Sequence, residues 1–213
     1  MIRISKTSKL DGIKSWSLQA IDTCPGSKGA DGQLVPACSG CYATTGNYVF
    51  PDVKAPRVAN REDWTRVEWV DDMVRALTKE SHFRWFDSGD AYDLRLLRKI
   101  AAVIERTPHV RHWLPTRMHK FPKFRATLER IDALPNAVVR YSSDAIDGAT
   151  VLGAHTSTIV SDHAQIPAGA SVCRAYEHGG TCSGCRACWS KSVPIVAYVA
   201  HGRKMASVIA RAS

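Results

Sequence analysis

Short apolar runs alternate with amphipathic helical patterns along most of this chain, and this alternation limits its fold more than any other feature. We expect strands at residues 13–18, 82–86, 110–114, 137–141, 156–160 and 193–199, and helices at 61–79, 93–106 and 121–133. Such alternation is typical of a parallel sheet with helices packed outside it. A complete eight-unit barrel takes about 250 residues, whereas this chain has 213. The pattern therefore predicts an α/β fold, a partial (β/α)6 TIM-like barrel.

The chain divides into three parts. Residues 1–165 hold the expected barrel core, with a long loop at 22–60 that is rich in Gly, Pro, Ser and Thr. Residues 166–192 form a cysteine-rich segment, and residues 193–213 return to the core as a last strand and a tail. Functional groups of parallel α/β folds collect at the carboxyl ends of the strands. We therefore expect the first cysteine loop and the turns after the next three strands to meet on one face.

Composition excludes several classes of protein. Hydrophobic residues make up 45% and charged residues 23% of the chain, which is ordinary for a globular domain. No apolar stretch has transmembrane length, and the first residues lack the apolar core of a signal peptide. We expect a cytoplasmic protein with no membrane partner. Seven cysteines, an odd number in a reducing compartment, favour metal binding or catalysis over disulfides.

The cysteines fall into two groups, and the second group has four members. Cys182, Cys185 and Cys188 follow one another at steps of three, and Cys173 supplies a fourth thiol. This spacing is typical of a four-iron cluster, whereas zinc sites usually show separated pairs. We interpret the group as an iron–sulfur site. A zinc site and unligated cysteines remain the alternatives.

The first group has three members, Cys24, Cys38 and Cys41, and no obvious fourth ligand. One interpretation is a zinc site completed by a distant histidine. The other is a four-iron cluster held by three thiolates, which leaves one iron open to another ligand. An open coordination position is typical of a catalytic metal site.

Three cysteines after a first strand, in a chain of alternating strands and helices, resemble the radical S-adenosylmethionine enzymes. The common spacing there is C-x3-C-x2-C, whereas this chain has C-x13-C-x2-C with Tyr42 directly after the last cysteine. The chain more narrowly resembles the bacteriophage "gene product eighty-eight" proteins, over most of its length. The segments that carry this resemblance are Cys24-Pro-Gly, Ala37-Cys-Ser-Gly-Cys-Tyr-Ala43, His112-Trp-Leu-Pro-Thr-Arg117 and Cys185-Arg-Ala-Cys-Trp189.

The resemblance to the radical enzymes implies two [4Fe-4S] clusters and S-adenosylmethionine as cofactors. The open iron would bind the methionine moiety, and one electron would then give a 5′-deoxyadenosyl radical. An external electron donor would supply that electron, and the second cluster would be auxiliary, as an electron relay or a structural element. The resemblance places cofactor binding at seven residues: Tyr42, Ser88, Gly89, Asp90, Ser142, Ser143 and Asp144. From the residues alone, the turn at 87–90 has a second interpretation as a simple structural turn.

The net charge of +9 is concentrated in one segment. Residues 98–130 hold nine basic and two acidic side chains, which are either solvated helix faces or a surface for a polyanion. Three of the cations, Arg117, Lys120 and Lys123, fall near the expected active face and are candidate substrate contacts.

These observations lead to a functional hypothesis. We expect a radical enzyme that rearranges or functionalises a nucleic-acid base, such as a modified pyrimidine in phage DNA. The alternatives are a non-catalytic zinc protein that binds nucleic acid, and a radical enzyme acting on a peptide or a small molecule. No catalytic acid or base can be assigned from the sequence.

Overall fold

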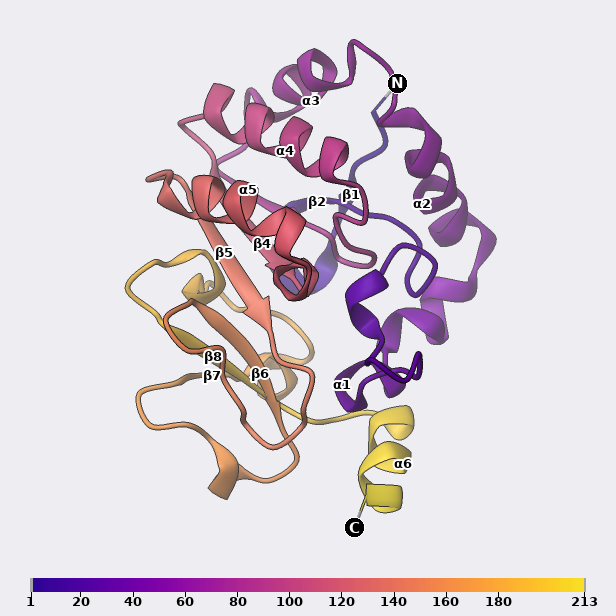
Figure 1. The fold of residues 1–213 in the computed structure, drawn as a ribbon, viewed down its shortest axis with the longest axis vertical. Helices are drawn as coiled ribbons and strands as arrows, with labels where there is room; N and C mark the ends of the chain where they lie inside the picture. Colours follow the sequence, from indigo (N-terminus) through magenta and orange to yellow (C-terminus); the bar gives the residue numbers. More distant parts are fainter. Residues whose placement is uncertain (1, 213) are drawn as a thin grey trace.

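The computed structural model describes residues 2–212, and a single eight-stranded sheet runs through them (Figure 1). The strand order is β1-β2-β3-β4-β5-β6-β8-β7, and all neighbours are parallel except β1 and β2. The strands are β1 (Ser5–Lys6), β2 (Lys14–Trp16), β3 (His82–Trp85), β4 (Arg111–Thr116), β5 (Ala137–Ser142), β6 (Thr156–Val160), β7 (Ser171–Cys173) and β8 (Ile195–Val199). All six predicted strands are present, and the sequence prediction missed only the short strands β1 and β7.

The sheet is open, so the predicted TIM-like barrel is not confirmed. The order from β2 to β6 follows the sequence, as in a barrel, but the sheet ends in β1 and β7, which each pair on one side only. Helices cover only the first half of the sheet. The connections after β5 are loops and short 3₁₀ turns, so no helical layer continues around the second half. The cysteine-rich segment 166–192 contributes β7 to this same sheet.

Six α-helices accompany the sheet. They are α1 (Pro36–Ser39), α2 (Pro51–Asp63), α3 (Trp69–Leu77), α4 (Leu94–Arg106), α5 (Pro122–Ala133) and α6 (Arg203–Ala212). The helices predicted at 93–106 and 121–133 are confirmed. Among the residues that the structure describes, no helix is long and apolar enough to cross a membrane.

The helix predicted at 61–79 is confirmed in part, because the structure has α3 there but breaks the predicted helix after α2. The loop expected at 22–60 ends earlier than predicted, since α2 begins at Pro51 and contains Pro56. Lys99 of α4 donates to the carbonyls of Trp64 and Arg66 in the break. The lysine thus satisfies carbonyl groups that a continuous helix would have bonded internally.

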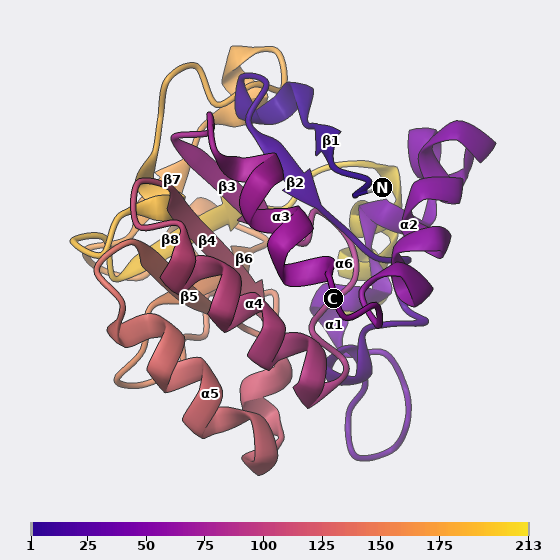
Figure 2. The ribbon, with the colours of Figure 1, turned by 90° about the horizontal axis from the view of Figure 1, so that it is seen from above.

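The main core lies between the sheet and the helices α3, α4 and α5, which stand in a row on one face of the sheet in Figure 2. Three tryptophans in its centre are fully buried, and Trp16 packs edge to face against both Trp69 and Trp85. Alternate strand positions point to the other face. There a smaller cluster of Leu10, Trp113 and Trp189 packs against two of the late cysteines.

Candidate functional site

The three N-terminal cysteines lie beyond the carboxyl end of β2. Cys24 precedes a 3₁₀ turn, Cys38 lies in α1, and Cys41 follows α1 directly. Burial raises the pKa of the Cys24 thiol to about 12, and the Asp90 carboxylate and the other two thiols act in the same direction. Burial also raises the pKa of Cys38. The thiols of Cys24 and Cys38 are therefore protonated at neutral pH unless a cation replaces the proton.

Three strand ends meet beside these thiols, as the sequence predicts. The Asp90 carboxylate, after β3, accepts from Thr116 Oγ1 at 2.7 Å and from the Arg117 backbone N–H at 2.9 Å, at the end of β4. Asp144, after β5, accepts from Arg117 Nε at 3.2 Å and from Lys120 Nζ at 2.6 Å. The Asp144 carbonyl accepts from the backbone N–H of Ala37 at 2.9 Å. The carboxyl edge and the cysteine loop are thus one hydrogen-bonded unit.

The first cysteine loop also packs tightly against β4. Lys120 donates to the carbonyls of Gly26 at 3.1 Å and Lys28 at 3.0 Å. A Cβ atom at Gly26 would lie only 2.6 Å from the Arg117 Cβ and 2.8 Å from its carbonyl oxygen. Glycine at this position allows the close approach, because any larger residue would push the loop away from the strand end.

The predicted cofactor-binding residues are engaged in the protein's own bonds. Tyr42 Oη donates to the Asp87 carbonyl at 2.7 Å, and Ser88 Oγ donates to the Leu18 carbonyl at 2.7 Å. Asp87 itself is paired with two arginines. Gly89 has a φ of +82°. The turn at 87–90 thus has a structural role, and Asp90 is its member closest to the three thiols.

Ser142 and Ser143 follow a similar pattern at the end of β5. Ser142 pairs with Ser157 in the sheet register. Ser143 accepts from Arg117 through its carbonyl at 2.7 Å. The structure therefore brings the predicted cofactor residues and the three cysteines together at one edge, and it shows the cofactor residues bonded to neighbouring side chains and backbone, above all to Arg117.

The predicted basic surface at 98–130 is neutralised in part, because four of its nine cations pair with carboxylates. Arg106 pairs with Asp71, Arg130 with Glu105, and Arg117 and Lys120 share Asp144. Two of these three carboxylates, Asp71 and Asp144, lie outside the segment. The net charge counted from residues 98–130 alone is therefore higher than the charge of this surface in the folded protein. Lys123 lies over the Phe124 ring, at 5.3 Å from its centroid.

The four C-terminal cysteines line one cavity of about 180 Å³. Cys173 lies in β7, Cys188 lies in the 3₁₀ turn Ala187–Trp189, and Cys182 and Cys185 lie in the loop between them. The Sγ atom of Cys188 lies 3.3 Å from Tyr198 Oη of β8. Cys185 is exposed, so the cavity opens to the surface.

Two charged side chains hold this cysteine segment in place. Arg140 of β5 is fully buried and donates to four carbonyls of the segment, at 2.8–2.9 Å. The Asp11 carboxylate accepts from the backbone N–H groups of Ser183 at 3.1 Å and Gly184 at 3.0 Å, and from Arg186. The segment is therefore fixed both to the sheet and to the N-terminal turn.

Donor chemistry and charge at the second group fit a thiolate-bound cluster. Among residues 2–212, no three Cys, His, Asp or Glu side chains are arranged to hold one metal ion. A single zinc ion needs sulfurs about 2.3 Å from a common centre, whereas these four thiols surround a larger space. Arg140 Nη1 is buried without a partner among the described residues; burial lowers the pKa of Arg140, and the Cys188 sulfur opposes this shift. A buried cation in this position suits an anionic group held by the thiols.

The family model of Gene product 88 matches residues 3–193. The chain belongs to the Gene product 88 family. This phage-type family agrees with the resemblance inferred from the cysteine segments, and the match includes both cysteine groups. No curated protein and no solved structure matches the chain. The comparisons do not link it to the radical S-adenosylmethionine superfamily.

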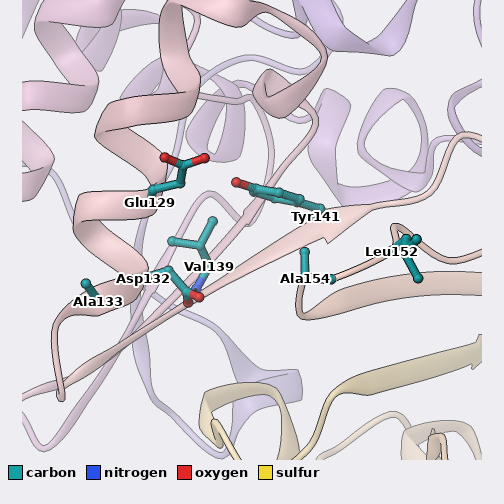
Figure 3. Close-up of a pocket in the computed structure, with 8 residues that line it drawn as sticks. Glu129, Asp132, Ala133, Val139, Tyr141, Leu152 and Ala154 are labelled. Atoms are coloured by element: carbon teal, nitrogen blue, oxygen red, sulfur yellow. The ribbon is translucent and has the colours of Figure 1, made fainter.

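Another pocket of this Gene product 88 protein lies elsewhere, between α5, β5 and the loop before β6 (Figure 3). It has a volume of about 460 Å³ and contains Glu129, Asp132 and Tyr141 in its wall. Asp132 already accepts from the Val139 backbone N–H at 2.9 Å. No predicted site residue lines this pocket, so it was not expected from the sequence.

Sequence reasoning missed two arginines in the strands of the sheet, Arg84, which is half-buried, and Arg140, which is fully buried. Arg84 lies over the Trp113 ring, 4.5 Å from its centroid, and pairs with Asp87 at 3.2 Å. A signal was present, because each arginine interrupts an apolar strand, in His82-Phe-Arg-Trp-Phe86 and in Ala137-Val-Val-Arg-Tyr141. A charge at such a position predicts a specific buried partner.

Proposed function

We propose that this protein is a radical S-adenosylmethionine enzyme that modifies a base of nucleic acid. The single observation that carries the proposal is the placement of the cysteines. Three thiols lie together at the carboxyl edge of a parallel sheet, and four others surround a separate cavity. An incomplete ligand set beside a complete one is the arrangement expected of a catalytic and an auxiliary cluster.

Cys24, Cys38 and Cys41 would hold the catalytic cluster, and Cys173, Cys182, Cys185 and Cys188 the auxiliary one. When bound, the catalytic cluster and S-adenosylmethionine supply one-electron cleavage of a sulfur–carbon bond, which yields a 5′-deoxyadenosyl radical. The role of the protein is then to bind, to orient and to exclude water.

The residues at the carboxyl edge are arranged for these tasks. Asp90 and Asp144 fix Arg117 and Lys120, and Lys120 in turn fixes the loop that contains Cys24. Cys38 is buried, so its thiol is shielded from solvent. This rigid set of bonds holds the three thiols at one place, which favours retention of a cluster with an open position.

The charge and the family of the chain support a nucleic-acid substrate. The chain carries a net charge of +9 and belongs to a phage-type family. A base within a duplex would have to be flipped out before a radical could reach it, so single-stranded DNA is the simplest substrate to test.

Anaerobic reconstitution with iron and sulfide, followed by reduction in the presence of S-adenosylmethionine, tests the proposal. We expect a brown protein that releases 5′-deoxyadenosine, measured by chromatography, even without substrate. The variant C24A/C38A/C41A should release none. Continued release by this variant would show that the catalytic cluster is assigned to the wrong cysteines.

Metal analysis of the purified protein separates the proposal from its alternatives. A colourless protein with zinc at both groups would replace the enzyme by a non-catalytic nucleic-acid-binding protein. Turnover of a peptide or a free small molecule, with none of DNA, would keep the radical chemistry and change the substrate class.

A further inference from the structure

We propose that the protein binds single-stranded nucleic acid on a surface that borders the first cysteine group. This surface, called here the α2–α6 surface, consists of Tyr42, Val49, Phe50, Lys54, Arg203 and Lys204. The inference rests on the proposed function only for the class of substrate. It adds the place on the protein where that substrate binds.

The apolar part of the α2–α6 surface is unusually exposed. The side chains of Tyr42, Val49 and Phe50 are 55–57% exposed, although all three are large and hydrophobic. They fall within nine residues that follow Cys41. Tyr42 is also fixed in place, because its hydroxyl donates to the Asp87 carbonyl and its ring packs edge-on against Tyr48 at 5.4 Å. An exposed aromatic ring held in one orientation is a preformed platform for stacking a base.

Free cations flank these rings. Helix α6 carries Arg203, Lys204 and Arg211 and no acidic residue. Lys54 follows Phe50 by one helical turn of α2, on the same side. Within residues 2–212 none of these four cations has a carboxylate within 4.0 Å. Their charge is therefore available to phosphates, unlike that of Arg106, Arg117, Lys120 and Arg130.

The α2–α6 surface is continuous with the candidate metal site. Helix α6 lies beside α1 in Figures 1 and 2, and Met205 is buried against Gly40, between Cys38 and Cys41. Lys204 donates to Thr44 Oγ1, which ties α6 to the turn that precedes Phe50. A strand bound across α6 and the exposed rings would pass the edge where the three thiols lie.

Single-stranded nucleic acid fits this surface better than a protein partner. Exposed aromatic rings interleaved with cations match a ligand that offers flat bases and regularly spaced phosphates. An acidic electron-donor protein would match the cations, but it would leave the rings without a specific counterpart.

Fluorescence anisotropy of a labelled thymidine oligonucleotide with the reconstituted protein tests the inference. We expect Phe50→Ser to weaken binding by about tenfold. We expect R203Q/K204Q to weaken it and to reduce the slope of log Kd against log salt by about 1.4, or about 0.7 for each lost phosphate contact. All three side chains are exposed, so these variants should fold, which circular dichroism would check.

Two matched controls remove the same kinds of side chain elsewhere. Leu152→Ser removes a fully exposed apolar side chain, and Arg111→Gln removes an exposed cation of the segment 98–130. Both should bind the oligonucleotide like the wild type. Equal losses in the controls, or unchanged binding in Phe50→Ser and R203Q/K204Q, would overturn the inference.

The remaining outcomes also decide the question. In one outcome the wild-type protein fails to bind the oligonucleotide at low salt, and an acidic donor protein reduces R203Q/K204Q more slowly than the wild type. This outcome would assign the surface to a protein partner and overturn the inference. A wild type that binds through this surface but yields no 5′-deoxyadenosine would support the inference and contradict the proposed radical chemistry.

Discussion

The guanidinium of Arg140 donates a hydrogen bond to the carbonyl oxygen of Cys188, with an N···O distance of 2.9 Å. The same side chain donates to the carbonyls of Ala187, Ser190 and Val193 and is completely buried. One residue of β5 thus fixes the backbone around the last cysteine. The cysteine segment and the sheet are therefore expected to unfold together.

Replacing Arg140 should destabilise the protein strongly. In Arg140→Met the four carbonyls lose a charged donor, and we expect the free energy of unfolding to fall by about 3 kcal/mol or more. Urea denaturation would measure this change. The four late cysteines should also react faster with a thiol reagent in the metal-free protein. Arg111→Met, at an exposed position, is the control, and a loss no larger than in this control would contradict the role of Arg140.

The two cysteine groups should lose metal independently. After reconstitution we expect about eight irons per chain in the wild type, and about four in either C24A/C38A/C41A or C182A/C185A/C188A. Only the second variant should still form 5′-deoxyadenosine. Because the groups are bonded to different parts of the sheet, loss of all iron on removing one group would contradict two separate sites.

His112 should make the protein sensitive to acid. Its Nδ1 accepts from Trp85 Nε1 at 3.2 Å, and its Nε2 lies 2.9 Å from Thr107 Oγ1. The indole can only donate, so the ring is neutral with its proton on Nε2. Burial, more than any other cause, lowers the pKa of His112 from 6.5 to about 3.

The direction of the pH effect follows from this lowered pKa. Between about pH 6.5 and pH 3 the unfolded chain binds a proton that the folded protein does not bind. Stability is therefore lost as the pH falls through this window, by up to about 1.4 kcal/mol per pH unit from this group. Urea denaturation at several pH values should show a shallower dependence in His112→Asn. Parallel curves for the two proteins below pH 6.5 would contradict the assignment.

Gly26 should be required for the first cysteine group. An alanine here would place its Cβ 2.6 Å from the Arg117 Cβ. We expect Gly26→Ala to cost about 1–3 kcal/mol and to reduce the iron retained by Cys24, Cys38 and Cys41. At Gly29 the nearest atom to a new Cβ is the Asp31 carboxylate oxygen, at 2.9 Å, and this side chain can move. The Gly29→Ala variant should therefore retain as much iron as the wild type and have the same free energy of unfolding. If it loses as much iron and stability as Gly26→Ala, the cause would be a general effect of alanine in the loop.

The strands and the later helices could be predicted from local pattern because each is set by its own periodicity. The apolar face of α4 and its Asp93 cap are both visible in the sequence, and the Asp93 carboxylate indeed accepts from the Arg95 N–H at 2.7 Å. The break between α2 and α3 could not be predicted in this way, since it depends on Lys99, a residue of another helix. Likewise β7 exists only because β8 offers it a partner.

The position of the candidate site could be predicted in part. Parallel topology alone implied that the turns after β3, β4 and β5 share one edge, and they do. The roles of Arg117 and Lys120 could not be predicted, because their partner Asp144 lies far along the chain. The contribution of α6 was also missed, since its contact with Gly40 joins the last helix to the first cysteine loop.

The sequence by itself determined the strand pattern, the division of the cysteines into three and four, and the family of this protein. These properties depend on residue type and spacing along the chain. Only the tertiary structure decided that the sheet stays open, that four of the nine cations in the basic segment pair with carboxylates, and that cations without a carboxylate partner lie on α6. Charge pairing and sheet closure depend on distances between residues remote in the sequence, and folding alone brings those residues together.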